Sequence, residues 1–478
     1  MLQSVPSRRP PAPVPHQKPP GALALIRALA HNPLEAWSEA HFTDGIVVTR
    51  LPFGRAAVVS EPAAIRRVLV ENAANYPKDP LQKRLLFTLA GGLLEAEGKD
   101  WEFQRRTLAP LFTRKVVQGF GEAMHAAVGA MLKGWSDGKT IDVAAECSLL
   151  ALDVLERTIF SDGLGNDARE IRTAMRSYFD TFGKIDPFDL AGVPGWVPRL
   201  TRRGAGGALR EFERATDTLI AQRRSRPDAA PHDLLTLLVQ ARDPASGRAM
   251  TEREIRANII TFMSAGHEST ANTIAWTLYL LSVTPEWRAR VVEESAHDPG
   301  KACPGLDPGW PPVSGQDHAP GKSVTRAVIE ETLRLYPPLA AISRVARGPD
   351  RLAGCDIPKG TLIVISPYVL HRHRALWARP DEFDPGRFLT GREKIDRFAY
   401  MPFGAGARGC IGQVFALQEA TIAVTRILAH CDLAVAPGHR VWPMHRITLQ
   451  PQGGLPMVVR KRARGARIVA APSLQAAE

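Results

Sequence analysis

The chain has 478 residues and a net charge of +12, and 45% of its residues are hydrophobic while 23% are charged. This is the composition of a globular protein, and the length allows a large core and one to three domains. No run of about 18 apolar residues occurs, so the sequence excludes a transmembrane helix. The five cysteines form no CxxC pair, which argues against a zinc or iron–sulfur site and for a soluble, cytoplasmic protein.

The two ends of the chain differ in composition from the rest. Residues 1–22 are rich in proline and lack the apolar core of a signal peptide, so we expect a flexible arm. Residues 461–478 begin with a basic cluster and predict a disordered tail. The chain between them, residues 23–460, contains no internal repeat and is expected to form one domain.

The first part of this domain combines one hairpin with many helices. Residues 45–60 alternate apolar and polar side chains around a Pro/Gly turn, which is typical of a β-hairpin. From Glu61 to about Glu294 most of the chain has the periodicity of amphipathic helices. Residues 184–200 interrupt it with an apolar, proline-punctuated loop. The sequence leaves three interpretations of this loop open: it packs on the core, it forms a flap over a pocket, or it touches a membrane.

A long helix is predicted over residues 251–282. Thr251 and Glu254 have the spacing of a capping box at its start. So long and apolar a helix must cross the interior of the protein, yet its middle, AGHEST (265–270), contains a carboxylate and two hydroxyls. Burying these groups costs free energy unless they have partners. The segment is therefore either a functional site or a kink whose polar groups bond internally.

Irregular, helical and strand segments follow in turn. Residues 297–322 are rich in proline and glycine and predict an irregular surface loop. A helix is expected within 323–338, where a proline pair ends it. Residues 351–370 predict two strands around a Pro-Lys-Gly turn. The predicted fold class is α+β, mainly α, with a minor sheet.

The stretch FGAGARGC, residues 403–410, contains three glycines and predicts a tight loop, because glycine disfavours both helix and strand. A helix-like apolar run begins directly behind it, over residues 411–431. Cys410 is then placed where a loop meets a helix N-terminus, and the backbone N–H groups there favour an anion. We expect these groups to hold Cys410 as a thiolate, the form that binds metal.

Four separated stretches resemble the cytochrome P450 family of haem-thiolate monooxygenases. The loop around Cys410 resembles the haem-binding loop, and AGHEST resembles the oxygen-activating helix motif. EETLR resembles the Glu-x-x-Arg helix, and FDPGRF resembles the segment that supplies a second arginine. The resemblance covers about residues 45–460 and implies the P450 fold, with a long central helix and haem b as cofactor. The matching residues outside AGHEST are Phe403, Gly406, Arg408, Cys410, Gly412, Glu331, Arg334 and Arg387.

The resemblance implies how the protein holds the haem. Cys410 is the proximal ligand of the iron, and Phe403 packs beside it and shields it from water. The residues expected to bind the two haem propionates are Arg408, Arg344, Arg105 and Trp101. The residues expected to form a buried charge network that positions the cysteine loop are Glu331, Arg334 and Arg387.

The resemblance also places the oxygen side of the haem at the middle of the long helix. Ala265 and Gly266 are small enough to let dioxygen lie against the backbone. Glu268 and Ser269 would deliver the protons that cleavage of the O–O bond consumes. Serine stands where the family usually has threonine and lacks the stiffening methyl group, so Thr270 is an alternative hydroxyl donor.

The expected substrate is apolar. The residues that resemble the family's pocket-lining segments are Leu93, Leu94, Ala340, Ala341 and Leu455. All are small to medium in size and carry no polar side-chain group, which suits a fatty acid, a terpenoid or a carotenoid-like lipid. The expected reaction is hydroxylation of a C–H bond by one atom of O2.

Electrons are expected from a separate protein, because the chain contains no flavin or nicotinamide motif and no ferredoxin cysteine pattern. A ferredoxin or flavodoxin with its reductase is the expected donor, and the charge of +12 suits an acidic partner. No nucleic-acid-binding motif accompanies this charge, so a nucleic acid is not an expected partner. We expect a bacterial-type monomer.

Two other functions stay open on the sequence alone. A haem peroxygenase would use hydrogen peroxide directly, but such enzymes tend to replace the acid–alcohol pair, which this chain keeps as Glu268 and Ser269. A non-catalytic haem sensor or a basic nucleic-acid-binding protein is the second alternative. The intact oxygen-side motif argues against a sensor, and the absence of a groove-reading motif argues against nucleic-acid binding.

Overall fold

The computed structural model describes residues 9–51, 54–79, 91–161, 205–225, 230–297, 323–390 and 394–462. Over these ranges the protein is α+β and mainly helical, as the sequence predicts. The helices are α1 (Ala22–His31), α2 (Glu39–Thr43), α3 (Pro62–Arg66), α5 (Gly98–Leu108), α6 (Arg114–Gln118), α7 (Gly121–Lys133), α8 (Val143–Phe160), α11 (Ala205–Ser225), α12 (Leu234–Gln240), α13 (Glu252–Val283), α14 (Pro285–His297), α15 (Val324–Leu335), α16 (Pro367–Leu370), α17 (Gly386–Thr390) and α18 (Gln413–His430). The strands are β1 (Ile46–Leu51), β2 (Gly54–Val59), β3 (Thr140–Asp142), β4 (Ile342–Val345), β5 (Asp350–Leu352), β6 (Cys355–Ile357), β7 (Leu362–Ile365), β8 (Cys431–Val435), β9 (Pro443–His445), β10 (Leu449–Pro451) and β11 (Pro456–Lys461).

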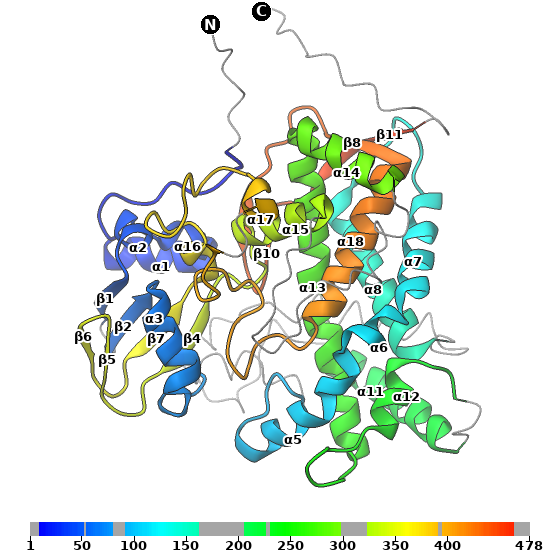
Figure 1. Ribbon diagram of the computed structural model, residues 1–478, viewed down its shortest axis with the longest axis horizontal. Coiled ribbons are helices and arrows are strands. Elements are labelled where there is room, and N and C mark those ends of the chain that lie inside the picture. The colour runs from blue at the N-terminus through cyan, green and yellow to red at the C-terminus, as the bar shows by residue number, and fades with distance from the viewer. Residues whose placement is uncertain are drawn as a thin grey trace, which may run out of the picture.

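The elements form two parts that lie side by side (Figure 1). On one side, the four-stranded sheet β1-β2-β7-β4 is accompanied by the short helices α1, α2, α3 and α16. On the other side, the long helices α7, α8, α13 and α18 lie together, with the sheet β3-β11-β8 at one end of them.

The central helix is α13, with 32 residues. The predicted capping box is confirmed, because Glu254 N–H donates to Thr251 Oγ1 at 3.2 Å and Thr251 N–H donates to Glu254 Oε2 at 2.8 Å. α13 packs against α8, α14, α15 and α18, and every residue from Thr270 to Leu281 is buried. The prediction that this helix crosses the interior is confirmed.

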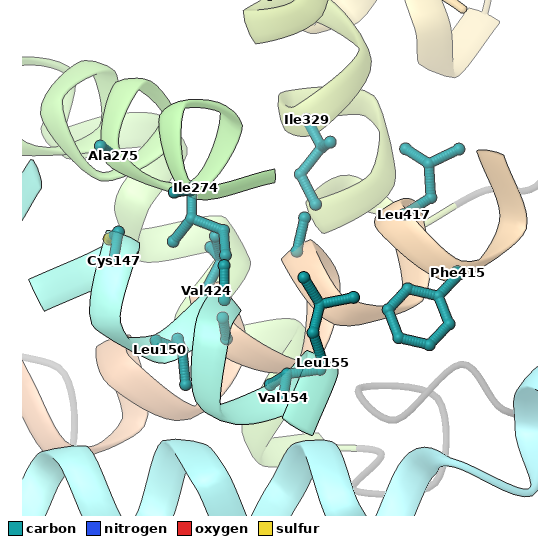
Figure 2. Close-up of a cluster of buried hydrophobic side chains, with 14 of the residues drawn as sticks. Cys147, Leu150, Val154, Leu155, Ile274, Ala275, Ile329, Phe415, Leu417 and Val424 are labelled. Atoms are coloured by element: carbon teal, nitrogen blue, oxygen red, sulfur yellow. The ribbon is translucent and has the colours of Figure 1, made fainter. Parts of the chain in front are cut away.

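The hydrophobic core forms where α8, α13, α15 and α18 meet, and Figure 2 shows part of it. Cys147 lies there on α8, fully buried among aliphatic side chains, and burial raises the pKa of its thiol. This is the environment of a structural core cysteine. Nearby, the ring of Trp276 on α13 stacks on Tyr336 with 3.9 Å between centroids, which fixes α13 against the end of α15.

Both strand predictions are confirmed, and the structure adds how the strands pair. The hairpin at 45–60 is present, with Ile46 of β1 opposite Val59 of β2. Strands β6 and β7 flank the Pro-Lys-Gly turn as predicted, but β6 pairs with β5, and β7 lies between β2 and β4. The physical reason is burial, because Ile363 and Ile365 of β7 are fully buried and an interior position in a sheet covers so apolar a strand.

Part of the N-terminal segment lies against the body of the protein. The Tyr336 hydroxyl donates to the Pro11 carbonyl at 2.8 Å, and His16 N–H donates to the Trp37 carbonyl at 3.0 Å. The arm expected over residues 1–22 therefore has fixed contacts within its second half.

Three predicted segments fall wholly or largely outside the described residues. They are the apolar loop at 184–200, the Pro/Gly-rich loop at 297–322 apart from His297, and the basic tail at 461–478. Of the tail, Lys461 is described as the last residue of β11, and Arg462 follows it.

Candidate functional site

Backbone hydrogen bonds close the tight loop that carries Cys410. Its N–H donates to the Phe403 carbonyl at 2.8 Å, and Gly409 N–H donates to the Gly406 carbonyl at 3.0 Å. α18 begins shortly afterwards, at Gln413. The prediction that Cys410 lies between a loop and a helix N-terminus is confirmed.

Gly406 is required by the path of this loop. Its φ of +73° lies in the left-handed region, which favours glycine. A Cβ atom at this position would collide with the Leu69 carbonyl. The loop therefore passes too close to neighbouring backbone for any larger residue to fit without a shift.

The environment of the Cys410 sulfur is enclosed. Its side chain keeps exposed surface, yet burial among protein atoms raises the pKa of the thiol. The sulfur therefore lies among protein atoms and still has surface that a ligand can reach. The Gly412 N–H and the Arg105 guanidinium lower the pKa, as expected for a helix N-terminus beside a cation. These groups alone do not outweigh burial, so the predicted thiolate needs a metal cation at the sulfur.

Three arginines lie in the same enclosed region. Burial lowers the pKa of Arg105, Arg344 and Arg408, that of Arg344 to about 10. Electrostatic interaction links Arg105 to Cys410 and Arg344 to Arg408. Glu97 favours the charged forms of Arg344 and Arg408, but none of the three arginines has an ion pair within the described ranges.

The contacts of Arg408 leave it in need of an anion. It donates to the Ala96 carbonyl at 3.2 Å, and its guanidinium lies 4.5 Å from the centroid of the Trp101 ring. A carbonyl and an aromatic ring do not neutralise a cation, and partly buried guanidinium groups bind carboxylates strongly. The predicted grouping of Trp101 with these arginines is what a ligand with two carboxylates requires.

The predicted charge network is confirmed. Glu331 and Arg334 are 0% exposed and form two hydrogen bonds of 2.7 and 2.8 Å. Arg387 Nε donates to Glu331 Oε1 at 3.2 Å. The other N–H groups of Arg334 donate to backbone carbonyls, at 2.7 Å to His371 and at 2.8 Å to Glu382. The Glu331 carboxylate therefore has two cationic partners, and the N–H groups of Arg334 have hydrogen-bond acceptors, as burial requires.

His371 connects this network to the cysteine loop, and the sequence analysis missed it. Its carbonyl accepts from Arg334, and its Nε2 accepts from Met401 N–H at 3.0 Å. Burial and the charge of Arg334 lower the pKa of His371 to about 3, so the ring is neutral and can accept. Met401 lies just before Phe403, so the link positions the start of the loop.

The middle of α13 presents its small residues in two directions. Ala265 is exposed, although α13 crosses the interior and most of its residues are buried. A Cβ atom on Gly266 would lie 3.3 Å from Leu155 Cδ2 of α8. The absence of a side chain at Gly266 therefore also serves helix packing, and the prediction that both residues make room for dioxygen stays a prediction. Ser269 Oγ donates to the Ala265 carbonyl at 2.7 Å, and Thr270 is buried.

Glu268 is held by a residue far along the chain. Thr448 Oγ1 donates to Glu268 Oε2 at 2.9 Å and accepts from Asn272 Nδ2 at 3.1 Å. One turn further along α13, Trp276 Nε1 donates to the Leu449 carbonyl at 3.2 Å. Burial raises the pKa of Glu268, and the hydrogen bond from Thr448 lowers it. The sequence analysis missed Thr448 and Asn272, because Thr448 lies about 180 positions from its partners and carries no local signal.

A family model described as cytochrome P450 matches residues 23–456 of the chain. The chain belongs to the cytochrome P450 family. It is 32% identical over 448 residues to cyclooctat-9-en-7-ol 5-monooxygenase of Streptomyces melanosporofaciens, which covers 93% of this chain and 95% of the relative. It is 31% identical over 436 residues to pentalenene oxygenase of Streptomyces avermitilis, which covers 90% of this chain and 94% of the relative.

The fold agrees with a solved P450 structure. The crystal structure of the cytochrome P450DA haem domain superposes with a TM-score of 0.78, covering 96% of this chain and 100% of that chain at 24% identity. This similarity shows the fold. The family membership makes the protein a P450 monooxygenase with a haem-thiolate cofactor.

The residues of this P450 fit the haem. Cys410 offers a sulfur with free surface, and three partly buried arginines that have no ion pair within the described ranges offer cations to the propionates. Ala265 leaves free surface on the central helix. In the part of the chain that the structure describes, no helix is long and apolar enough to span a membrane.

The residues predicted to line the substrate pocket of this P450 have different environments. Leu94 is exposed and Ala341 partly exposed, whereas Leu93 and Ala340 are buried. Leu455 is 0% exposed, and its N–H donates to Asp142 Oδ1 at 2.8 Å. It belongs to the core beside β3, so the prediction for Leu455 is wrong. Leu339, directly after the proline pair, is 43% exposed.

Proposed function

We propose that this P450 hydroxylates an apolar substrate, with a terpenoid favoured over a fatty acid or a carotenoid-like lipid. The substrates named for two relatives, cyclooctat-9-en-7-ol and pentalenene, are an unsaturated alcohol and an unsaturated hydrocarbon. The exposed side chains of Leu94 and Leu339 are also apolar. Both observations support a substrate recognised mainly by shape and apolar contact.

The observation that carries the proposal is the acid–alcohol pair in the middle of α13. Glu268 is largely enclosed, has a raised pKa and is oriented by Thr448. Ser269 follows it directly and donates to the carbonyl one turn earlier. An enclosed acid beside a hydroxyl is an arrangement that relays protons, and haem storage or sensing does not require one.

Haem bound through Cys410 supplies the activation of O2 and the transfer of one oxygen atom to a C–H bond. The chain binds and orients this cofactor. Arg105, Arg344 and Arg408 would bind the propionates, and the network of Arg334 and His371 would keep the cysteine loop in place.

Glu268 and Ser269 deliver the protons that the reaction consumes. Two protons and two electrons convert the second oxygen atom into water. Because burial raises the pKa of Glu268, this side chain can carry a proton nearer to neutral pH than an exposed glutamate can. The Ser269 hydroxyl passes a proton on by turning its O–H away from the Ala265 carbonyl, donating that proton and accepting the one that Glu268 supplies.

A separate ferredoxin or flavodoxin with its reductase supplies the two electrons in this proposal. The net charge of +12 supports an acidic donor. In this proposal the protein acts as a monomer in the cytoplasm.

The experiment compares two ways of driving the reaction: O2 with an electron donor, and hydrogen peroxide alone. The haem-containing protein is incubated with a panel of terpenoids, fatty acids and carotenoids under 18O2, with a ferredoxin, its reductase and NADPH. A parallel set receives hydrogen peroxide alone. We expect hydroxylated product with one 18O atom from a terpenoid only in the first set, and at least about tenfold less with peroxide. Equal turnover with peroxide indicates a peroxygenase, and binding without turnover in either set indicates a sensor.

A further inference from the structure

An exposed apolar stripe runs along α1. Leu23, Ile26 and Leu29 are 86%, 63% and 52% exposed. Spaced three residues apart, they lie on one face of the helix, within about 120° of its circumference. Leu25 and Ala28 are partly buried and lie on the opposite side, which rests on the body of the protein.

This stripe is where the exposed aliphatic side chains of the protein concentrate. Ten large hydrophobic side chains are exposed within the described ranges. Three of them belong to the ten residues of α1. The fold anchors this region, since His16 donates to the Trp37 carbonyl. A fixed, contiguous apolar surface of this kind marks a contact site.

Positive charge accompanies the stripe. Arg27 and His31 are exposed and lie one turn apart on the flank of α1 beside Leu23, and Lys18 is exposed just before the helix. Residues 1–34 contain four lysine or arginine residues and no aspartate or glutamate. The contact site therefore attracts anions as well as apolar groups.

We infer that α1 binds the surface of an anionic lipid bilayer. Leu23, Ile26 and Leu29 insert at the boundary between headgroups and acyl chains, and Arg27 faces the lipid phosphates. A bilayer offers apolar and anionic groups in adjacent layers, which matches a helix with an apolar stripe and a cationic flank. A second copy of the chain would bring the same positive segment, and two such segments repel. The bilayer also dissolves apolar compounds, so binding there brings the P450 to its substrate.

The experiment sediments the full-length, haem-containing protein with vesicles. One set contains phosphatidylcholine with phosphatidylglycerol, and the other contains phosphatidylcholine alone. The variant Leu23→Gln/Ile26→Gln removes the stripe and keeps good helix formers. The variant Val283→Gln is the matched control, because Val283 is 50% exposed at the far end of α13. The visible spectrum of each variant reports an intact haem site independently of membrane binding.

We expect the wild type to bind the anionic vesicles at least about tenfold better than the neutral ones, and less at high salt. Leu23→Gln/Ile26→Gln should bind about tenfold less or weaker still, Arg27→Gln about fivefold less, and Val283→Gln as well as the wild type. The inference is overturned if the double variant sediments like the wild type, or if both vesicle types bind equally. It is also overturned if the wild type ignores vesicles and forms a dimer that the double variant dissociates.

Discussion

The two faces of the cofactor site are held in different ways. On the cysteine side, Arg334 links Glu331 to the His371 carbonyl, and His371 holds Met401 at the start of the loop. On the oxygen side, Glu268 depends on one side-chain hydrogen bond from Thr448. A substitution on the cysteine side should therefore lower the stability and the haem content. A substitution on the oxygen side should lower the product formed per NADPH consumed, in a protein that still folds.

The largest expected effect comes from breaking the network on the cysteine side. Arg334→Met leaves Glu331 buried without its partner, so we expect the free energy of unfolding to fall by about 3–5 kcal/mol and the haem content to drop. Urea unfolding and the haem-to-protein ratio measure both. The control is Arg66→Ala, because Arg66 pairs with Glu71 at the surface, where a pair contributes about 0–1 kcal/mol. Equal stability of the two variants would contradict the assigned role of the network.

The next effect lies on the oxygen side. Glu268→Gln removes the proton carrier, and we expect product formation to fall about 100-fold with unchanged haem content. Ser269→Ala should divert reducing equivalents into hydrogen peroxide, since protons then arrive at the wrong time. Product and peroxide formed per NADPH consumed measure both variants. Unchanged product per NADPH in Ser269→Ala would remove this hydroxyl from the mechanism.

A third prediction concerns Glu419 on α18, directly behind the cysteine loop. Its carboxyl group is 2% exposed with no hydrogen-bond partner within the described residues, and burial raises its pKa well above the ordinary value. The native state then keeps a proton that the unfolded state releases, so stability falls as the pH rises above about 4.5. The variant Glu419→Gln does not undergo this loss. Its free energy of unfolding should exceed that of the wild type by about 1–3 kcal/mol at pH 7 and should equal it near pH 4.

Thermal or urea unfolding at several pH values checks this prediction. Glu122→Gln is the control, because Glu122 is exposed on α7. A gain that is the same at every pH would show that ionisation of Glu419 is not its cause. A loss at neutral pH would show that the carboxyl group has a partner in the holo-protein.

The smallest effect is expected at Thr448. Thr448→Val removes one hydrogen bond to Glu268, so product per NADPH should fall about two- to tenfold, and Thr448→Ser should restore it. In the Glu268→Gln background the same change should add nothing, because Thr448 acts through that carboxylate. Additive losses in the double variant would show that Thr448 acts independently of Glu268.

The sequence predicts those features whose signals are local. The capping box at Thr251, the helix start behind Cys410 and the pairing of Glu331 with Arg334 each depend on residues within a few positions. For Gly266, the local signal did not indicate its packing against Leu155, because that residue lies on another helix.

Long-range contacts account for the features that the sequence analysis missed. His371 meets Met401 across 30 positions, and Thr448 meets Glu268 across 180. Leu455 was misplaced because its environment is set by the Asp142 carboxylate at the end of β3. No pattern along the chain encodes these partners, since tertiary packing chooses them.

The measurement that tests the account most directly is the visible spectrum of the reduced, CO-treated protein. We predict the Soret band characteristic of a thiolate-ligated haem for the wild type and for the control Cys355→Ser, whose thiol lies on β6 away from the cysteine loop. Cys410→Ser should lose this band and all monooxygenase activity. A thiolate-type band that survives in Cys410→Ser would contradict the central claim that Cys410 binds the haem iron.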